Sequence, residues 1–224
     1  MRAGDGGPGS ASPAAFPHGL FITLEGPEGS GKSSQARWLA QALARDGCRV
    51  TRLCDPGSTA LGRALRRLLL ETRTDLSPLA EALLFIGGRV QLVEERIRPA
   101  LSRRRVVVCD RFHDSTLAYQ GFGGGLDVRW LDRVGRAALR GAMPRLTVLL
   151  DLPHHVGFAR LRRRRDRMER KGAAFHRRVR AGFLRLAARE PRRFVTVDGS
   201  RPAREVRRAI EAAVRRRLEK CQAP

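Results

Sequence analysis

Short apolar runs alternate with segments of helical periodicity along the chain from Gly19 onward. The runs, which are rich in Val, Leu and Ile, are residues 19–25, 49–54, 104–110, 145–151 and 192–198. The helical segments lie near residues 31–46, 59–72, 78–101, 127–141, 154–190 and 202–220. Because apolar strands that are each followed by a helix are typical of a parallel sheet covered on both faces, the pattern predicts a three-layer α/β fold. Such sheets bind their ligands at the carboxyl ends of the strands.

The segment 78–101 has the clearest helix start, because Ser77 stands directly before Pro78. Its apolar residues follow alternating spacings of four and three, at Leu79, Leu83, Ile86, Val90, Val93 and Ile97. A seam of this kind can pair with a second subunit. It can equally face the sheet of its own chain, as the apolar stripe of any helix in a layered fold does. The sequence leaves both interpretations open.

The composition fits one soluble domain with a large positive charge. The chain has 224 residues, 42% of them apolar, and its 45 Lys and Arg against 22 Asp and Glu give a formal charge of +23. Three of the basic residues are Lys and 42 are Arg. The mean hydropathy is −0.35, and no apolar run is long enough for a membrane-spanning helix. We therefore expect no membrane partner.

The cysteine spacing indicates the cellular compartment, and the composition of the N-terminal residues indicates where the folded domain begins. The four cysteines form neither a C-x-x-C pair nor a zinc-like spacing with His, which favours a reducing cytoplasm. Residues 1–17 contain 13 Gly, Pro, Ala or Ser and lack the apolar stretch of a secretory signal. We expect residues 1–17 to be a disordered tail and residues 18–220 to be the folded domain.

The segment 26–33 matches the P-loop pattern G-x-x-x-x-G-K-[ST] and stands between a predicted strand and a predicted helix, as a P-loop must. Its glycines let backbone N–H groups turn toward phosphate oxygens, and the helix N-terminus adds the positive end of its dipole. Lys32 would reach the β- and γ-phosphates, and Ser33 would reach Mg²⁺. The residues predicted to bind ATP are Gly26, Pro27, Glu28, Gly29, Ser30, Gly31, Lys32, Ser33 and Ser34. A glycine-rich turn that binds nothing is the alternative.

A P-loop alone does not distinguish a kinase of small acceptors from a switch or mechanical NTPase or a nucleic-acid machine. The next motif narrows the choice, because Asp110 ends a strand, where a carboxylate can hold the shell of Mg²⁺. Arg111 can bind phosphates through two N–H groups. A polar pocket wall follows on one or two helical turns, formed by Ser115, Thr116, Tyr119 and Gln120.

Phe85 and Arg89 are four residues apart in the segment 78–101 and share one helix face. A ring and a guanidinium on one face can hold a nucleobase, the first by stacking and the second by hydrogen bonding to an exocyclic oxygen. Taken alone, Phe85 would more often be a core residue.

The order of these motifs resembles the thymidylate kinase family over about residues 19–215. The segments that carry the resemblance are LEGPEGSGKSS (24–34), DPGSTALGRALRRLLL (55–70), LLFIGGRVQLVEERIRPAL (83–101), CDRFHDSTLAYQG (109–121), 160–186 and VDGS (197–200). The resemblance implies an ATP-dependent nucleoside monophosphate kinase that phosphorylates dTMP to dTDP with Mg²⁺, in nucleotide biosynthesis. It also implies a P-loop NTPase fold with strand order 2-3-1-4-5 and a homodimer that uses helix 78–101.

The resemblance assigns roles to residues of the acceptor site. Glu28 would lie near the sugar and phosphate end of dTMP. Phe85 would stack on thymine, and Arg89 would bond its O4. Thr116 would face the polar edge of the base, and the ring of Tyr119 would disfavour ribose at the 2′ position. For phosphoryl transfer, Arg111 would clamp phosphates and Asp110 would orient Arg111 or a metal-bound water.

Residues 160–193 contain 14 Arg and one Lys against three acids, a net charge of +12. Such a strip can bind a nucleic-acid backbone. Alternatively, residues 160–172 are a lid that closes over the triphosphate and brings arginines to the transferred group. In family terms a P-loop without Arg requires the lid to supply it, so we predict Arg163, Arg165 and Arg167 as catalytic and do not expect nucleic acid as a partner. A non-catalytic P-loop protein that binds nucleic acid remains the alternative.

The chain departs from the family pattern at two places. Cys54-Asp55-Pro56-Gly57-Ser58-Thr59 stands where the family has Arg-Glu-Pro-Gly-Gly-Thr, and Gly124 replaces another usual Arg. Losing a charged partner of a phosphate costs about 1.5–3 kcal/mol. We therefore predict that Arg66 joins Arg111 in the acceptor-phosphate clamp. A divergent kinase with a different acceptor nucleotide remains an alternative.

Overall fold

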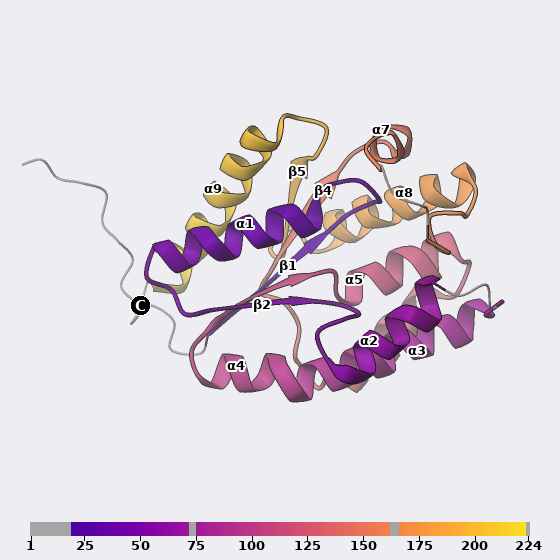
Figure 1. Ribbon diagram of the computed structural model, residues 1–224, viewed down its shortest axis with the longest axis horizontal. Coiled ribbons are helices and arrows are strands. Elements are labelled where there is room, and N and C mark those ends of the chain that lie inside the picture. Colours follow the sequence, from indigo (N-terminus) through magenta and orange to yellow (C-terminus); the bar gives the residue numbers. More distant parts are fainter. Residues whose placement is uncertain (1–18, 72–74, 162–165, 223–224) are drawn as a thin grey trace, which may run out of the picture.

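The computed structural model describes residues 19–71, 75–161 and 166–222, with side chains up to residue 217. Its centre is a parallel sheet in the order β2-β3-β1-β4-β5 (Figure 1). The strands are β1 (Leu20–Glu25), β2 (Val50–Cys54), β3 (Val106–Asp110), β4 (Leu146–Asp151) and β5 (Phe194–Asp198). The predicted strands and their predicted order are thereby confirmed. The predicted tail, residues 1–17, lies outside the described residues.

Helices cover both faces of the sheet (Figure 1). One face carries α1 (Lys32–Arg45) and α9 (Ala203–Gln222), and the other carries α3 (Pro78–Leu92), α4 (Arg98–Ser102), α6 (Val128–Leu139) and α8 (Ala173–Arg189). Shorter helices follow the ends of β2, β3 and β4, namely α2 (Ala60–Arg66), α5 (His113–Thr116) and α7 (His154–Ala159). π-Helical turns continue α2, α3 and α5, namely η2 (Arg67–Glu71), η3 (Val93–Ile97) and η4 (Leu117–Gly123).

The alternation of side chains along the central strand β1 builds a core on each face of the sheet. Ile22 and Leu24 pack with Leu39 of α1 on one face. On the other face, the Phe21 ring meets the Phe112 ring edge to face, with centroids 4.9 Å apart. Burying each of these side chains contributes about 1.5–3 kcal/mol. The two cores fix the carboxyl ends of the strands, where polar residues gather.

The predicted helix 78–101 is observed as α3, η3 and α4 in direct succession. Ser77 caps its start by accepting the Ala80 N–H at 3.2 Å. In the first half of the seam, Leu79 is 43% and Leu83 is 48% exposed. The buried residues of the seam are Ile86, Val93 and Ile97. The second half of the seam therefore faces its own chain, and the first half faces outward.

The predicted helical segment 154–190 is divided in the structure, because α7 ends at Ala159 and α8 begins at Ala173. Between them, the Asp166 N–H donates to Glu169 Oε2 and the Glu169 N–H donates to Asp166 Oδ1, both at 2.9 Å. Carboxylates that capture backbone N–H groups in this way compete with helix formation. Among the described residues, no helix is both long and apolar enough to cross a membrane.

Candidate active site

A cavity of about 860 Å³ opens at the carboxyl edge of the sheet. Its wall is formed by the P-loop, the ends of β2 and β3, and parts of α3, η4 and the segment after α7. The predicted site residues that line it are Glu28, Gly29, Ser30, Gly31, Lys32, Ser33, Ser34, Arg66, Phe85, Arg89, Asp110, Arg111, Ser115, Thr116 and Tyr119. Most of the residues predicted from scattered motifs therefore meet around one space.

Three glycines give the P-loop a backbone conformation that other residues adopt only with strain. The φ angles of Gly26, Gly29 and Gly31 are 142°, 69° and 85°. A Cβ atom on Gly26 would lie 2.3 Å from the Leu150 carbonyl oxygen, because β4 passes directly behind the loop. Helix α1 begins immediately after Gly31. The positive end of its dipole therefore meets the loop, which favours an anion there.

The Lys32 ammonium lies folded over the P-loop. It donates to the Pro27 carbonyl oxygen at 2.7 Å and to the Ser30 hydroxyl at 3.1 Å. Burial and the neighbouring Arg111 lower the pKa of Lys32 to about 8. The negative charge of a bound phosphate would favour the protonated ammonium, so the position fits a phosphate contact.

The residues predicted to hold metal are in direct contact. The Ser33 hydroxyl at the start of α1 donates to Asp110 Oδ2 at the end of β3, at 2.5 Å. Within the described ranges, no group of three His, Cys, Asp or Glu side chains is arranged to hold a metal ion. One hydroxyl and one carboxylate nevertheless fit Mg²⁺, which takes few protein ligands and completes its shell with water and substrate phosphates.

Arg111 is the most highly connected side chain of the site. Its Nη1 donates to the Gly26 carbonyl oxygen at 3.2 Å and to the Ser115 hydroxyl at 3.1 Å, and its Nη2 donates to Glu28 Oε1 at 3.0 Å and to the Tyr119 hydroxyl at 3.1 Å. The Tyr119 hydroxyl in turn donates to Glu28 Oε1 at 2.6 Å. Burial raises the pKa of Glu28, but Arg111 is among the groups that outweigh this effect and bring it to about 2. The charged Glu28 therefore holds the guanidinium against the P-loop.

A second arginine is buried at the far end of the cavity. Arg89 is only 2% exposed, and its Nε donates to Asp55 Oδ2 at 2.6 Å. Its guanidinium carbon lies 5.4 Å from the centre of the Phe112 ring. Arg89 Nη1 and the Thr116 hydroxyl are buried without a hydrogen-bond partner among the described residues. With Phe85 one helical turn before Arg89 on the same cavity wall, these groups fit a flat heterocycle that carries acceptor atoms.

Comparisons with known proteins agree with this geometry. A model of the thymidylate kinase family matches residues 24–210. A thymidylate kinase of Deinococcus radiodurans is 48% identical over 201 residues, which cover 89% of this chain and 98% of that protein. The chain belongs to the thymidylate kinase family. It is therefore a nucleoside monophosphate kinase, and the phosphorylation of dTMP to dTDP is the reaction of its family.

Further relatives extend the comparison to other bacteria and to a solved structure. A thymidylate kinase of Synechococcus sp. strain JA-2-3B'a(2-13) is also 48% identical, over 89% of this chain and 96% of that protein. The crystal structure of a thymidylate kinase from Ehrlichia chaffeensis matches with a TM-score of 0.73 and 30% identity, over 89% of this chain and 99% of that one. The observed strand order 2-3-1-4-5 is thus that of a thymidylate kinase P-loop fold.

The position at which the family resemblance predicts an Arg, and this chain has Cys54, is part of the cavity wall. Cys54 lines the cavity at the end of β2, and the next residue, Asp55, is the carboxylate that holds Arg89. Arg66 lines the same wall from the end of α2, and its Nη1 donates to the Pro56 carbonyl oxygen at 3.2 Å. Its place is compatible with the predicted phosphate clamp, which stays a prediction.

The three predicted lid arginines are not among the residues that line the cavity in the described structure. Arg163 and Arg165 lie outside the described residues. Arg167 is not among the residues that line the cavity, because its Nη2 forms an ion pair with Glu81 and its Nε donates to the Leu69 carbonyl oxygen at 2.8 Å. Arg167 would have to leave Glu81 to reach a transferred phosphoryl group. The catalytic role of all three arginines stays a prediction.

Two further parts of the site were not named from the sequence. Arg160 and the loop after β5 line the cavity, and the Arg160 guanidinium donates to the carbonyl oxygens of Gly199 at 2.7 Å and Ser200 at 2.8 Å. The VDGS motif pointed to this loop, but it did not indicate which residue would meet it.

Glu25 is the second missed residue, and it lies fully buried at the end of β1. Its Oε1 accepts the Phe112 N–H at 2.7 Å, and its Oε2 accepts the Ser115 hydroxyl at 2.6 Å. Burial and the nearby Asp114 raise the pKa of Glu25 to about 8. The residue ties the backbone that follows Arg111 to the central strand. An acid directly after an apolar strand and before the P-loop was the signal available in the sequence.

Proposed function

We propose that this chain transfers the γ-phosphoryl group of ATP to the 5′-phosphate of dTMP, with Mg²⁺ as the metal. One observation carries the proposal: Lys32 of the P-loop and the slot formed by Phe85 and Arg89 line a single cavity. A triphosphate on the P-loop would therefore face a nucleotide in the slot. Family membership supports dTMP as the acceptor, and the Ser33 and Asp110 oxygens support Mg²⁺.

The base slot favours a carbonyl group over an amino group at position 4 of a pyrimidine. Asp55 engages Nε of Arg89 and leaves Nη1 without a partner among the described residues, so Nη1 is free to donate to thymine O4. Thr116 offers a further hydroxyl, and Phe85 offers a stacking surface. Cytosine would place its 4-amino group, a donor, against the Arg89 Nη1 donor. The resulting unpaired buried polar group costs about 1–3 kcal/mol. The expected discrimination against dCMP is therefore about tenfold to a hundredfold.

Phosphoryl transfer would depend on positioning and on charge neutralisation. The attacking oxygen of dTMP belongs to a phosphate that is already anionic, so no side chain has to remove a proton. Arg111 can exchange its internal acceptors for phosphate oxygens, and Lys32 can move from the Pro27 carbonyl oxygen to the donor phosphates. Bound Mg²⁺, held by Ser33 and Asp110, would neutralise charge on the β- and γ-phosphates.

The sugar and the donor base can be assigned to the remaining walls. Tyr119 and Glu28 share a hydrogen bond beside Arg111, and we place the deoxyribose of dTMP against them. The wall formed by Arg160 and residues 199–203 lies beyond the P-loop, and we place the adenine of ATP there.

An acceptor panel tests the proposal. Initial rates of ADP formation would be measured with ATP and Mg²⁺ and, in turn, dTMP, dUMP, dCMP, dGMP and UMP. We expect dTMP to have the highest kcat/KM and dCMP to fall at least about tenfold below it. The kcat/KM for UMP should also be lower, because Tyr119 crowds its 2′-hydroxyl. No turnover with dTMP would contradict the proposal. A higher kcat/KM for another nucleotide would favour the divergent kinase that the Cys54 replacement leaves open.

We further propose that the chain forms a homodimer in the cytoplasm. Leu61 on α2 and Leu79 and Leu83 on α3 are large apolar side chains exposed near each other on packed helices. The absence of cysteine pairing motifs favours a reducing compartment. Analytical ultracentrifugation tests the dimer: the native chain should sediment as a dimer and Leu83→Glu as a monomer. A native monomer at micromolar concentration would contradict it.

A further inference from the structure

The parallel sheet starts all its strands at the edge opposite the cavity, and arginines gather there. Four of the five strands are directly preceded by arginine. These are Arg49 before β2, Arg103–Arg105 before β3, Arg145 before β4, and Arg192 and Arg193 before β5. Hydrogen bonds between neighbouring strands hold these arginines side by side. The Val106 N–H donates to the Arg49 carbonyl oxygen, and the Thr147 N–H donates to the Arg193 carbonyl oxygen, both at 2.9 Å.

Five of these residues, the amino-edge arginines, are exposed: Arg49, Arg103, Arg104, Arg145 and Arg192. Within the described residues, none of their guanidinium groups forms an ion pair or a hydrogen bond. The other two arginines are used internally: Arg105 donates to Thr51 and to the Val50 carbonyl oxygen, and Arg193 is held by Asp114 and Glu190. The exposed members therefore keep their full charge available.

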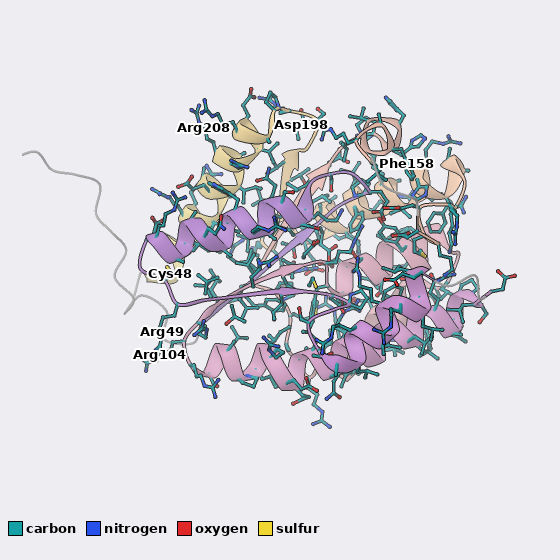
Figure 2. The ribbon with its side chains drawn as sticks, viewed as in Figure 1. Cys48, Arg49, Arg104, Phe158, Asp198 and Arg208 are labelled. Atoms are coloured by element: carbon teal, nitrogen blue, oxygen red, sulfur yellow. The ribbon has the colours of Figure 1, made fainter. Side chains whose placement is uncertain are left out.

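Two described carboxylates near this edge are already engaged. Asp46, at the end of α1, pairs with Arg215 at 3.7 Å, and Glu190 pairs with Arg136 at 3.1 Å and with Arg193 at 2.8 Å. Figure 2 shows Arg49 and Arg104 at one end of the molecule, with Phe158 and Asp198 toward the other. The edge is thus a positive surface far from the kinase cavity.

In the arginine-rich strip 160–193, by contrast, five of the ten described arginines are used inside the protein. Its side chains bind carbonyl oxygens or carboxylates of the chain at Arg160, Arg167, Arg178, Arg180 and Arg193. The free surface is assembled from residues that lie far apart in the sequence and meet only because parallel strands begin together.

We propose that the amino-edge arginines bind the phosphate backbone of nucleic acid, in an activity separate from the kinase. Strands about 4.8 Å apart place β2 and β5 about 19 Å from each other, the length of between about five and six base-pair steps of a duplex. Guanidinium groups suit phosphate geometry. An anionic membrane is the poorer fit, because interfacial binding needs apolar side chains beside the cations. Among the described residues, the exposed large apolar side chains lie on other elements, namely Leu61, Leu79, Leu83 and Leu184.

A matched pair of variants tests the proposal on the full chain. The edge variant is R49Q/R104Q/R145Q/R192Q, and the control variant R37Q/R133Q/R177Q/R208Q removes the same charge from exposed positions on four helices. Binding to a labelled duplex of about twenty base pairs would be measured by fluorescence anisotropy between about 50 and 200 mM salt. Native affinity should fall roughly a hundredfold over that range, as expected for about four phosphate contacts.

The edge variant should bind at least about tenfold more weakly than the native chain at the lowest salt, with a flatter salt dependence, and the control variant should stay within about threefold. Both variants should keep the native kcat for dTMP phosphorylation. Equal losses in the two variants would mean that only net charge matters and would overturn the proposal. Absence of salt-dependent duplex binding, or binding to phosphatidylserine vesicles without duplex binding, would also overturn it.

Discussion

Arginines at the two edges of the sheet differ in what holds them. At the carboxyl edge, Arg89 and Arg111 lie against carboxylates, with nitrogen to oxygen distances of 2.6 Å to Asp55 and 3.0 Å to Glu28. At the amino edge, the described structure gives the five exposed amino-edge arginines, such as Arg49, no such partner. An arginine side chain carries about 2 kcal/mol of rotamer entropy. At the carboxyl edge this rotamer entropy is lost during folding. The guanidinium groups are therefore already held in one orientation before a ligand binds.

The difference separates two uses of one residue type. A fixed guanidinium can select a ligand by shape and by the direction of its N–H groups, as the base slot requires. A free guanidinium attracts phosphate over a longer range and without selection, and salt weakens it. The net charge of +23 does not distinguish these cases, whereas the partners of each arginine do.

The largest effect that we expect comes from removing a fixed cation of the carboxyl edge. Lys32→Ala should lower kcat for dTMP phosphorylation by about a thousandfold, because no other described ammonium lies at the P-loop. A coupled ADP assay measures the rate, and circular dichroism checks the fold. Lys171→Ala is the matched control, since Lys171 lies 3.8 Å from Glu81 and does not line the cavity. A similar loss in both variants would remove the special role of Lys32.

Breaking the buried pair at Arg89 should have the next largest effect. Asp55→Ala leaves a buried guanidinium without its carboxylate, which costs about 3–5 kcal/mol of unfolding free energy. Asp46→Ala breaks an exposed pair with Arg215 instead and should cost less than about 1 kcal/mol. Urea denaturation measures both. Equal costs would mean that burial does not decide how firmly a carboxylate holds an arginine.

Glu25 is a carboxylate of the carboxyl edge that has no ion-pair partner among the described residues. Its folded-state pKa is about 8 against an ordinary value of 4.5, because of burial and Asp114, so the folded chain keeps a proton that the unfolded chain releases. Stability from this group is therefore full below about pH 4.5 and is lost as the pH rises toward 8.

Glu25→Gln keeps the shape and removes this dependence on pH. Relative to the native chain, the variant should gain up to about 1.4 kcal/mol of unfolding free energy for each pH unit between about 5 and 8. Urea midpoints at several pH values measure the gain. Gln can still accept the Phe112 N–H, so a stability difference that does not vary with pH would contradict a proton held by Glu25.

The fold and the place of the cavity could be predicted because their signals are local. Apolar runs predicted the strands, and the pattern around Lys32 predicted a P-loop, which lines the cavity. The pairing of Arg89 with Asp55 could not be predicted from spacing, since 34 residues separate them in the sequence. The ion pair of Arg167 with Glu81 could not be predicted for the same reason, because 86 residues separate them. Long-range ion pairs depend on how helices pack, and the periodicity of one helix does not contain that information.

Arg66 offers the finest test of the comparison, because it stands at the carboxyl edge but resembles the amino-edge arginines. It is exposed and has a carbonyl oxygen, not a carboxylate, as its acceptor. If it completes the phosphate clamp that Cys54 leaves short, Arg66→Ala should raise KM for dTMP about tenfold and change kcat little, since a charged hydrogen bond is worth about 1.5–3 kcal/mol. Arg63→Ala on the same helix, outside the cavity wall, should leave KM unchanged. An unchanged KM in Arg66→Ala would leave Arg111 as the arginine that holds the acceptor phosphate. It would also show that an arginine that lines the cavity without a carboxylate partner does not contribute to binding dTMP.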